Sequence, residues 1–166
     1  MIQESKGNLL EADVEAIVNA VNTVGVMGKG IALQFKQAFP ENFKQYKAAC
    51  DRSEVRVGEI FVHEAQPLGP RRYVLNFPTK RHWRGKSRAE DVRAGLDALV
   101  EVIKEYRIES IAIPALGCGH GGLDWGDVHP MIQTAFESLP TVEVLLFPPA
   151  GAPSPDSTPA RTGAPE

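Results

Sequence analysis

The chain has 166 residues, of which 43% are hydrophobic and 23% charged, and its formal net charge is −3. These values are typical of a globular domain with its own hydrophobic core, and the two cysteines, Cys50 and Cys118, are too few and too far apart for a disulfide-stapled secreted scaffold or a redox pair. No apolar run approaches the roughly twenty residues of a membrane span, and no apolar signal core follows Met1. We therefore expect a cytoplasmic protein.

Short apolar runs of β type alternate with helical patterns through residues 1–147. The predicted strands are Ala16–Val21, Glu59–His63, Tyr73–Phe77, Ser110–Ala115 and Thr141–Phe147. The predicted helices are Gly30–Phe39, Glu41–Cys50, Ala89–Tyr106 and Val128–Leu139. This order predicts an α/β fold, a three-layer α/β/α sandwich around a mixed, mostly parallel sheet.

The helix predicted over Ala89–Tyr106 has the strongest pattern. Its apolar residues Val92, Leu96, Leu99, Val100 and Ile103 fall on one face. Ser87 and Glu90 have the spacing of a capping box, so we expect Ser87 to cap this helix.

The composition changes after Phe147. Residues 148–166 contain six Pro, four Ala and two Gly, with no aromatic or branched aliphatic residue. Such a segment buries too little surface to offset its ordering entropy, so we predict one domain over residues 1–147 and a linker or tail over 148–166. The proline content favours a spacer ahead of a further domain.

Two glycine-rich segments follow predicted strands. The first has Gly25, Gly28 and Gly30 before a helix, whose free amides and positive dipole end favour an anion. The second, residues 117–122, has four glycines, and its backbone amides suit a diphosphate. Neither has a Walker or a Rossmann pattern, and glycines that serve only the turn are the alternative. For Cys118 we favour packing over a role as nucleophile.

Lys80 follows a buried strand within a basic stretch. Seven basic residues and no acidic one lie between Arg71 and Arg88, which predicts a cationic patch. Burial and neighbouring cations lower the pKa of an ammonium group, so Lys80 is a candidate nucleophile, with a phosphate-contacting or solvated lysine as the alternative. His82 and Trp83 in the same stretch would stack a base beside a phosphate backbone, and a solvated loop is the alternative.

Four segments together resemble the macro domain, an ADP-ribose-binding family. They are Gly7–Leu10, Asp13–Asn22, Gly28–Ala32 and Gly117–Gly122. Within this family, the chain is similar to the subclass of terminal ADP-ribose glycohydrolases and, within it, to DarG-type antitoxins. The motifs that carry this similarity are Met27–Ala32, the Thr79-Lys80 pair, and Gly117–Gly119 followed by Leu123 and Trp125. DarG-type antitoxins act against DarT-type toxins, which ADP-ribosylate thymidine in single-stranded DNA.

The resemblance implies a role for individual residues. Asn8 and Leu9 would contact adenine, and Asn22 the distal ribose, with Lys80 and Asn22 as the catalytic residues. The other implied ADP-ribose contacts are Met27, Gly28, Lys29, Gly30, Ile31, Ala32, Thr79, Gly117, Cys118, Gly119, His120, Gly121 and Gly122. Two positions depart from the family pattern, because Asn8 stands in place of aspartate and Gly121 stands where the human-type relative has an aspartate. The second departure deprives Lys80 of an acidic partner.

The implied function is hydrolysis of ADP-ribosyl thymidine in single-stranded DNA. Arg81, His82, Trp83, Arg84 and Lys86 would bind the DNA, and Lys80 would act as a neutral amine or as an ammonium acid. We expect no metal and no cofactor beyond the ADP-ribose of the substrate, a monomer, and a DarT-type toxin bound through a further carboxy-terminal domain. A non-catalytic ADP-ribose reader and a hydrolase of protein ADP-ribosyl-glutamate are the alternatives.

Overall fold

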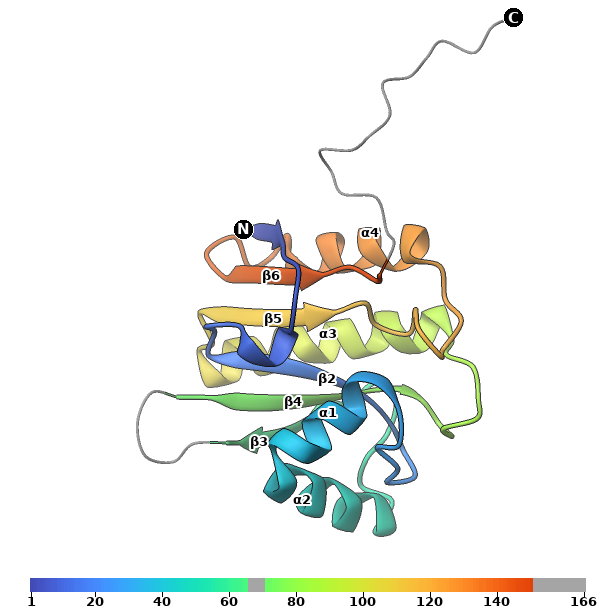
Figure 1. Cartoon of the computed structure of the whole chain (residues 1–166). Coiled ribbons are helices and arrows are strands. Elements are labelled where there is room, and N and C mark those ends of the chain that lie inside the picture. The colour runs from blue at the N-terminus through green and yellow to red at the C-terminus, as the bar shows by residue number, and fades with distance from the viewer. Residues whose placement is uncertain (66–70, 151–166) are drawn as a thin grey trace, which may run out of the picture.

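A computed structural model describes residues 1–65 and 71–150. Its centre is a six-stranded sheet in the order β1-β6-β5-β2-β4-β3 (Figure 1). The strands are β1 (Ile2–Glu4), β2 (Ala16–Asn22), β3 (Phe61–Glu64), β4 (Tyr73–Lys80), β5 (Ser110–Pro114) and β6 (Glu143–Phe147). Every neighbouring pair is parallel except β3 with β4. The prediction of a mixed, mostly parallel sheet is confirmed.

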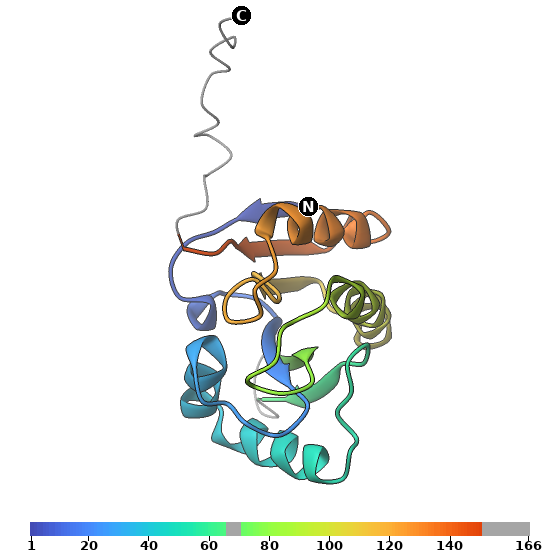
Figure 2. The same ribbon diagram turned by 90° about the vertical axis from the view of Figure 1, so that its right-hand side faces the viewer.

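Helices cover both faces of this sheet. They are the 3-10 helix η1 (Leu9–Glu11) and the α-helices α1 (Gly30–Ala38), α2 (Pro40–Asp51), α3 (Ala89–Tyr106) and α4 (Trp125–Phe136). Figure 2 shows α3 and α4 on one side of the sheet and η1 and α1 on the other. The predicted three-layer sandwich is therefore confirmed.

The middle of the sheet is buried on both faces. All seven residues of β2 except Ala20 are buried, and so are the first seven of β4. The predicted apolar face of α3 packs on one side of these strands, with Leu96, Leu99 and Ile103 each at most 2% exposed. On the other side, Phe35 of α1 packs against Ile17 and Val74.

Several element boundaries differ from the prediction. The strand β1 was not predicted, because three residues are too short for a recognisable alternation. β4 continues to Lys80 because the whole segment pairs with β2. Helix α4 begins at Trp125 because Asp124 caps it, with Oδ1 accepting from the Gly126 amide at 2.9 Å.

The predicted capping box of α3 is wrong. The N-cap residue is Arg88, which makes no side-chain capping bond, and Ser87 lies one residue outside the helix. Ser87 instead packs against the loop after β5, as described below. The capping pattern was correct in spacing, but tertiary contacts with that loop determine where the serine lies.

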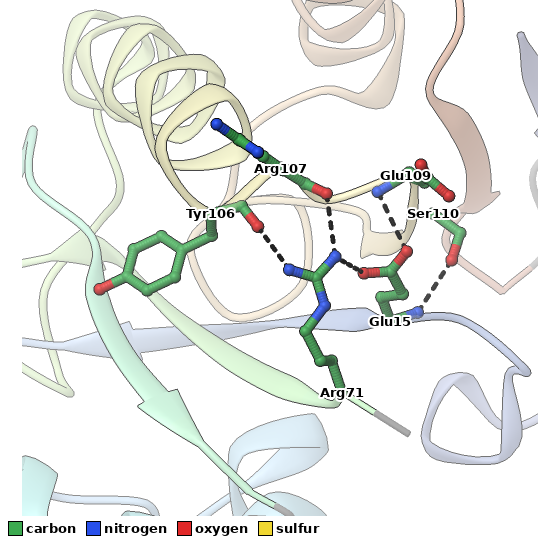
Figure 3. Close-up of polar contacts among 6 residues, drawn as sticks. All are labelled: Glu15, Arg71, Tyr106, Arg107, Glu109 and Ser110. Carbon is green, nitrogen blue, oxygen red and sulfur yellow. Dashed lines mark hydrogen bonds and ion pairs between the residues drawn. The ribbon is translucent and has the colours of Figure 1, made fainter. Parts of the chain in front are cut away.

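The predicted cationic patch is also divided by the sheet. Arg71 and Arg72 precede β4, whereas the basic residues from Lys80 onward stand at its carboxyl end. Arg71 donates hydrogen bonds to the Glu15 carboxylate at 2.9 Å and to the carbonyls of Tyr106 and Arg107 at 3.0 and 3.1 Å (Figure 3). A run of charge in sequence thus becomes two separate groups of cations.

Glu15 ties together the amino ends of three strands. Its carboxylate accepts from Arg71 and from the Glu109 amide, and its own amide donates to Ser110 Oγ at 2.9 Å.

Within residues 1–65 and 71–150, no helix has the length and apolar character of a membrane span. Most of the predicted tail, residues 151–166, lies outside the described residues.

Candidate functional site

Three loops meet at the carboxyl ends of neighbouring strands. The first loop (residues 23–29) follows β2, the second loop (residues 81–88) follows β4, and the third loop (residues 115–124) follows β5. Because β5, β2 and β4 are adjacent in the sheet, the three loops form one edge of the molecule. Ligands of open parallel sheets bind at this edge.

Direct contacts join the loops to one another. Thr23 Oγ1 of the first loop donates to the carbonyl of Arg81 in the second at 2.8 Å. The Ser87 amide of the second loop donates to the carbonyl of Gly121 in the third at 3.0 Å. A Cβ atom built on Gly30 would lie 3.9 Å from the His120 ring, so the start of α1 faces the third loop.

At the amino end of α1, backbone amides make no hydrogen bond to the residues that the structure describes. Its N-cap residue, Lys29, makes no side-chain capping bond, and its first turn has no acidic residue. The first turns of α2, α3 and α4 each contain at least one acidic residue. A helix start with free amides and no acid favours an anion.

The third loop has further amides that make no hydrogen bond to the described residues. Its shape is fixed by bonds from Cys118 to Ala115, from Gly122 to Gly119 and from Leu123 to Gly117, at 2.9–3.2 Å. The amides of Gly119, His120 and Gly121 make no hydrogen bond to the residues that the structure describes. Both glycine-rich segments therefore supply donors, as the sequence predicted for a diphosphate site.

Asn22 and Lys80 lie side by side at the carboxyl ends of two adjacent strands. Val21 pairs with Pro78 and Asn22 with Lys80, so Thr79 is an extra residue that forms a bulge in β4. The bulge brings the last residues of β2 and β4 level with each other, and bulges of this kind redirect side chains next to functional sites. Thr79 itself is 5% exposed, so little of it faces the loops.

The Asn22 side chain organises the first loop. Its Oδ1 accepts from the amides of Val24 and Val26 at 3.1 and 3.3 Å and from the Tyr46 hydroxyl at 2.9 Å. Its Nδ2 donates to the Val26 carbonyl at 2.7 Å. An amide nitrogen carries two hydrogens, so one N–H of Asn22 makes no bond to the described residues, although Asn22 as a whole is only 4% exposed.

Lys80 has the environment that eases loss of its proton. Its Nζ donates to the Trp83 carbonyl at 3.0 Å. Burial, followed by the like charges of Lys86 and Lys29, lowers the pKa of Lys80. Both charges that shift this pKa are cationic, and the amine therefore reaches its neutral form at a lower pH than an ordinary lysine.

Position 121 has no room for an acidic side chain. A Cβ atom on Gly121 would lie 2.3 Å from Ser87 Oγ and 2.5 Å from the Gly117 carbonyl oxygen. Gly117 is also required, because its φ is +73° and a Cβ there would lie 2.7 Å from Leu123. Glycine at these two positions thus lets the second loop pack on the third.

Cys118 is not activated as a nucleophile. Burial, with smaller contributions from Asp124 and Asp127, raises the pKa of its thiol to about 11. Its Sγ contacts the Leu116 carbonyl at 3.5 Å. A thiol in this state is protonated near neutral pH, which agrees with the packing role favoured from the sequence.

The residues predicted to bind DNA divide into three groups. Trp83 is 39% exposed, stacks on His82 with 5.3 Å between ring centroids and lies under the Arg84 guanidinium at 4.4 Å. Arg81 forms an ion pair with Asp91 of α3 at 3.1 Å. Lys86 lies over Gly122, with Nζ 3.4 Å from a Cβ built there, so it faces the third loop.

Other predicted contact residues have buried side chains. Leu9 and Met27 are 3% and 1% exposed and belong to the core, and Ile31 and Ala32 are partly buried against it. Asn8 caps η1, with Oδ1 accepting from the Leu10 amide at 3.0 Å. Any contact of Leu9 and Met27 with ADP-ribose would therefore run mainly through their backbones.

Sequence reasoning missed two features of this edge. Val24 and Val26 lie in the first loop, directly after Asn22, and are 44% and 38% exposed. Valines beside glycines in a loop were an available signal for this exposed apolar surface. Tyr46 lies in α2, and no spacing rule links it to Asn22.

Across the two described ranges, no three His, Cys, Asp or Glu side chains gather as metal ligands would.

Comparisons with known proteins agree with this geometry. The Macro domain family matches residues 18–132. A DNA ADP-ribosyl glycohydrolase from Thermus aquaticus is 56% identical over 153 residues, which cover 92% of this chain and 42% of the relative. One from Mycobacterium tuberculosis is 51% identical and covers 91% of this chain and 43% of the relative. The chain thus spans about two-fifths of the length of these curated relatives.

Solved structures give the same result. The macrodomain of Mycobacterium tuberculosis DarG superposes with a TM-score of 0.88 at 51% identity, covering 90% of this chain and 99% of that one. Thermosipho africanus DarTG, solved in complex with ADP-ribose, superposes with a TM-score of 0.84 at 32% identity, covering 93% of this chain and 43% of that one. The chain therefore belongs to the macro domain family.

Proposed function

We propose that this chain is the catalytic domain of a hydrolase that removes ADP-ribose from ADP-ribosylated thymidine in single-stranded DNA. The observation that carries the proposal is the position of Lys80, level with Asn22 at the edge where two loops have backbone amides that make no hydrogen bond to the described residues. The names of the Thermus aquaticus and Mycobacterium tuberculosis relatives, both DNA ADP-ribosyl glycohydrolases, support it.

The diphosphate of ADP-ribose is the ligand that fits the paired loops. The start of α1 approaches the third loop, and both have amide donors that make no hydrogen bond to the described residues. Lys29 and Lys86 add positive charge around Lys80 without an acidic neighbour in the first turn of α1. The Thermosipho africanus relative, solved with ADP-ribose, supports this assignment.

With the diphosphate held there, the distal ribose would lie toward Asn22 and Lys80. The neutral Lys80 amine attacks the anomeric carbon, the bond from that carbon to the thymine nitrogen breaks, and the leaving base takes the proton that the new ammonium loses. The bond from the anomeric carbon to the ring oxygen then breaks, which gives an open-chain imine, and water adds to this imine, releases ADP-ribose and restores the amine. The free N–H of Asn22 donates to a ribose oxygen and orients the sugar.

Apolar residues around Lys80 favour a nucleobase as the leaving group. Among the described residues, the exposed large hydrophobic side chains are Met1, Val24, Val26 and Trp83. The last three belong to the two loops beside Asn22 and Lys80. Trp83, with Arg84 over its ring, offers a stacking face next to a cation, which is how single-stranded nucleic acids are held.

The test compares two substrates. A single-stranded oligonucleotide with one ADP-ribosylated thymidine, and a protein ADP-ribosylated on glutamate, are each incubated with the chain, and free ADP-ribose and the restored thymidine are measured by mass spectrometry. We expect release from the oligonucleotide, with a rate that falls as salt rises because phosphate contacts are lost. Preferential release from the protein would instead favour the glutamate hydrolase.

A non-catalytic reader is the second candidate, because Gly121 leaves Lys80 without an acidic partner. Turnover distinguishes the two. A reader would bind ADP-ribose and release none from the oligonucleotide, whereas the hydrolase would release it without an acid at position 121, since burial and two neighbouring cations already lower the pKa of Lys80.

We also propose a DarT-type toxin as the partner of the full-length protein. A Thermosipho africanus relative is a fusion of DNA ADP-ribosyl transferase and DNA ADP-ribosyl glycohydrolase, 34% identical over 142 residues. Co-expression with such a toxin tests the role: the chain should rescue growth, and Lys80→Ala should not if rescue depends on hydrolysis alone. Rescue by Lys80→Ala would point to direct binding of the toxin.

A further inference from the structure

Tyr46 is a fully buried side chain that reaches the candidate site from beneath. It lies in α2 and is 0% exposed. Its hydroxyl is 2.8 Å from the backbone oxygen of Asn22 and 2.9 Å from the Asn22 side-chain Oδ1. Burial raises the pKa of the phenol, so the hydroxyl keeps its proton and acts as a donor.

The bonds of Asn22 fix the orientation of its amide. The amides of Val24 and Val26 and the hydroxyl of Tyr46 all meet Oδ1. Rotating the amide by half a turn would place Nδ2 against the two backbone donors, so this orientation is the one that satisfies them. Nδ2 then keeps one N–H for a ligand, beyond its bond to the Val26 carbonyl.

A second polar contact holds α2, and with it Tyr46, on the sheet. Asn42 lies one helical turn before Tyr46 and is 0% exposed. Asn76 Nδ2 of β4 donates to Asn42 Oδ1 at 2.8 Å, and Asn42 Nδ2 donates back to Asn76 Oδ1 at 3.2 Å. Two contacts at i and i+4 on one helix face keep the Tyr46 hydroxyl at a fixed place.

We propose that Tyr46 is a positioning residue for the reaction: it holds Asn22 so that its free N–H faces the ribose next to Lys80. This inference rests on the proposed function, because that function places the distal ribose at Asn22. Tyr46 touches neither substrate nor Lys80 in this role. It acts through Asn22: its single proton is shared between the Asn22 backbone oxygen and Oδ1, and Oδ1, which also accepts from two backbone amides, leaves the side-chain nitrogen of Asn22 to donate to the sugar.

The test is a double-mutant cycle with Tyr46→Phe and Asn22→Ala, measured on the ADP-ribosylated oligonucleotide and by calorimetric binding of ADP-ribose. Phenylalanine fills the same volume, and circular dichroism checks that the variant folds. We expect Tyr46→Phe to lower kcat about tenfold with a smaller change in KM, and to have no further effect in the Asn22→Ala background. A merely structural role would give equal losses in both backgrounds.

Tyr106→Phe is the matched control. Tyr106 packs edge-on against Tyr73 with 5.3 Å between ring centroids, near the opposite end of the sheet, and its loss of a hydroxyl should leave kcat unchanged. Wild-type kcat from Tyr46→Phe, or equal losses with and without Asn22, would overturn the positioning role. If the wild-type chain releases no ADP-ribose, the proposed function fails. The cycle measured on ADP-ribose affinity then tests Tyr46 separately: a loss in Tyr46→Phe that is absent in the Asn22→Ala background supports its action through Asn22, and equal losses in both backgrounds overturn it.

Discussion

The strands β2, β4 and β5 have two very different ends. At their amino ends, the Glu15 carboxylate and the Arg71 guanidinium bond to each other and to backbone groups of the adjoining segments (Figure 3). At their carboxyl ends, the start of α1 and the third loop leave amide donors without a protein acceptor among the described residues. At the amino ends, side chains of the protein satisfy the polar groups. At the carboxyl ends, backbone amides have no acceptor among the described residues.

This difference indicates that the amino ends of the strands contribute to stability, whereas the carboxyl ends serve binding. Polar groups that bond within the protein contribute to folding, whereas unpaired donors and clustered lysines contribute nothing to it until a ligand arrives. Substitutions at the two ends should therefore separate stability from activity. Four predictions test this separation.

The largest effect is expected for Lys80→Ala at the carboxyl end. Loss of the amine removes the proposed nucleophile, so release of ADP-ribose from the modified oligonucleotide should fall at least about 100-fold, while ADP-ribose still binds. Lys44→Ala, which changes an exposed lysine of α2, is the control and should keep full activity. Unchanged release by Lys80→Ala would remove the lysine from the mechanism.

A side chain at position 121 should damage both stability and binding. The Cβ of Gly121→Asp would collide with Ser87 Oγ and the Gly117 carbonyl oxygen. We therefore expect the free energy of unfolding to fall by about 2–3 kcal/mol and ADP-ribose binding to become unmeasurable. Gly119→Ala is the matched control, since nothing lies within 4 Å of a Cβ there, and its urea midpoint should equal that of the wild type. A stable Gly121→Asp with increased turnover would mean that the third loop rearranges to admit an acid.

At the amino end, Arg71→Ala should affect stability alone. The substitution removes one ion pair and two bonds to backbone carbonyls, which together stabilise the fold by about 1 kcal/mol, and ADP-ribose affinity should not change. Urea unfolding and calorimetric binding measure the two quantities. Arg52→Ala, which removes an exposed pair with Glu54, should cost less. A loss of affinity in Arg71→Ala would show that the two ends are coupled.

The smallest predicted effect is a displacement of the pH profile. Lys86 is one of two cations that lower the pKa of Lys80, so Lys86→Ala should raise that pKa and move the profile of kcat toward higher pH. If the neutral amine acts, the wild-type rate rises with pH through this pKa; if the ammonium acts, it falls. The Lys44→Ala profile should coincide with that of the wild type, and an unmoved profile in Lys86→Ala would exclude the coupling.

Much of this architecture could be predicted from the sequence because it depends on local patterns. The apolar face of α3 and the continuous apolar run of β4 gave their elements directly. The loops that follow β2, β4 and β5 came together because parallel strands place their carboxyl ends at one edge. Asn22 and Lys80 lie level with each other because of a bulge at Thr79, and no residue pattern in the sequence predicts this bulge.

The rest depended on contacts between distant segments. Ser87 had the spacing of a helix cap, yet it packs against Gly117 and Gly121. Arg71 lay in the same basic stretch as Arg84, yet β4 separates them. Met27 belonged to a motif of the candidate site, yet its side chain is buried in the core. In each case a tertiary partner, absent from the local sequence, decides the outcome.

The close fit of Ser87 against Gly121 also bears on how this site varies among homologues. A homologue with any side chain in place of Gly121 needs a different arrangement at position 87, because the two occupy the same space. Exchange at one of these positions should therefore be accompanied by exchange at the other. Covariation of the pair would mark which macro domains give their lysine an acidic neighbour and which, like this one, surround it with cations.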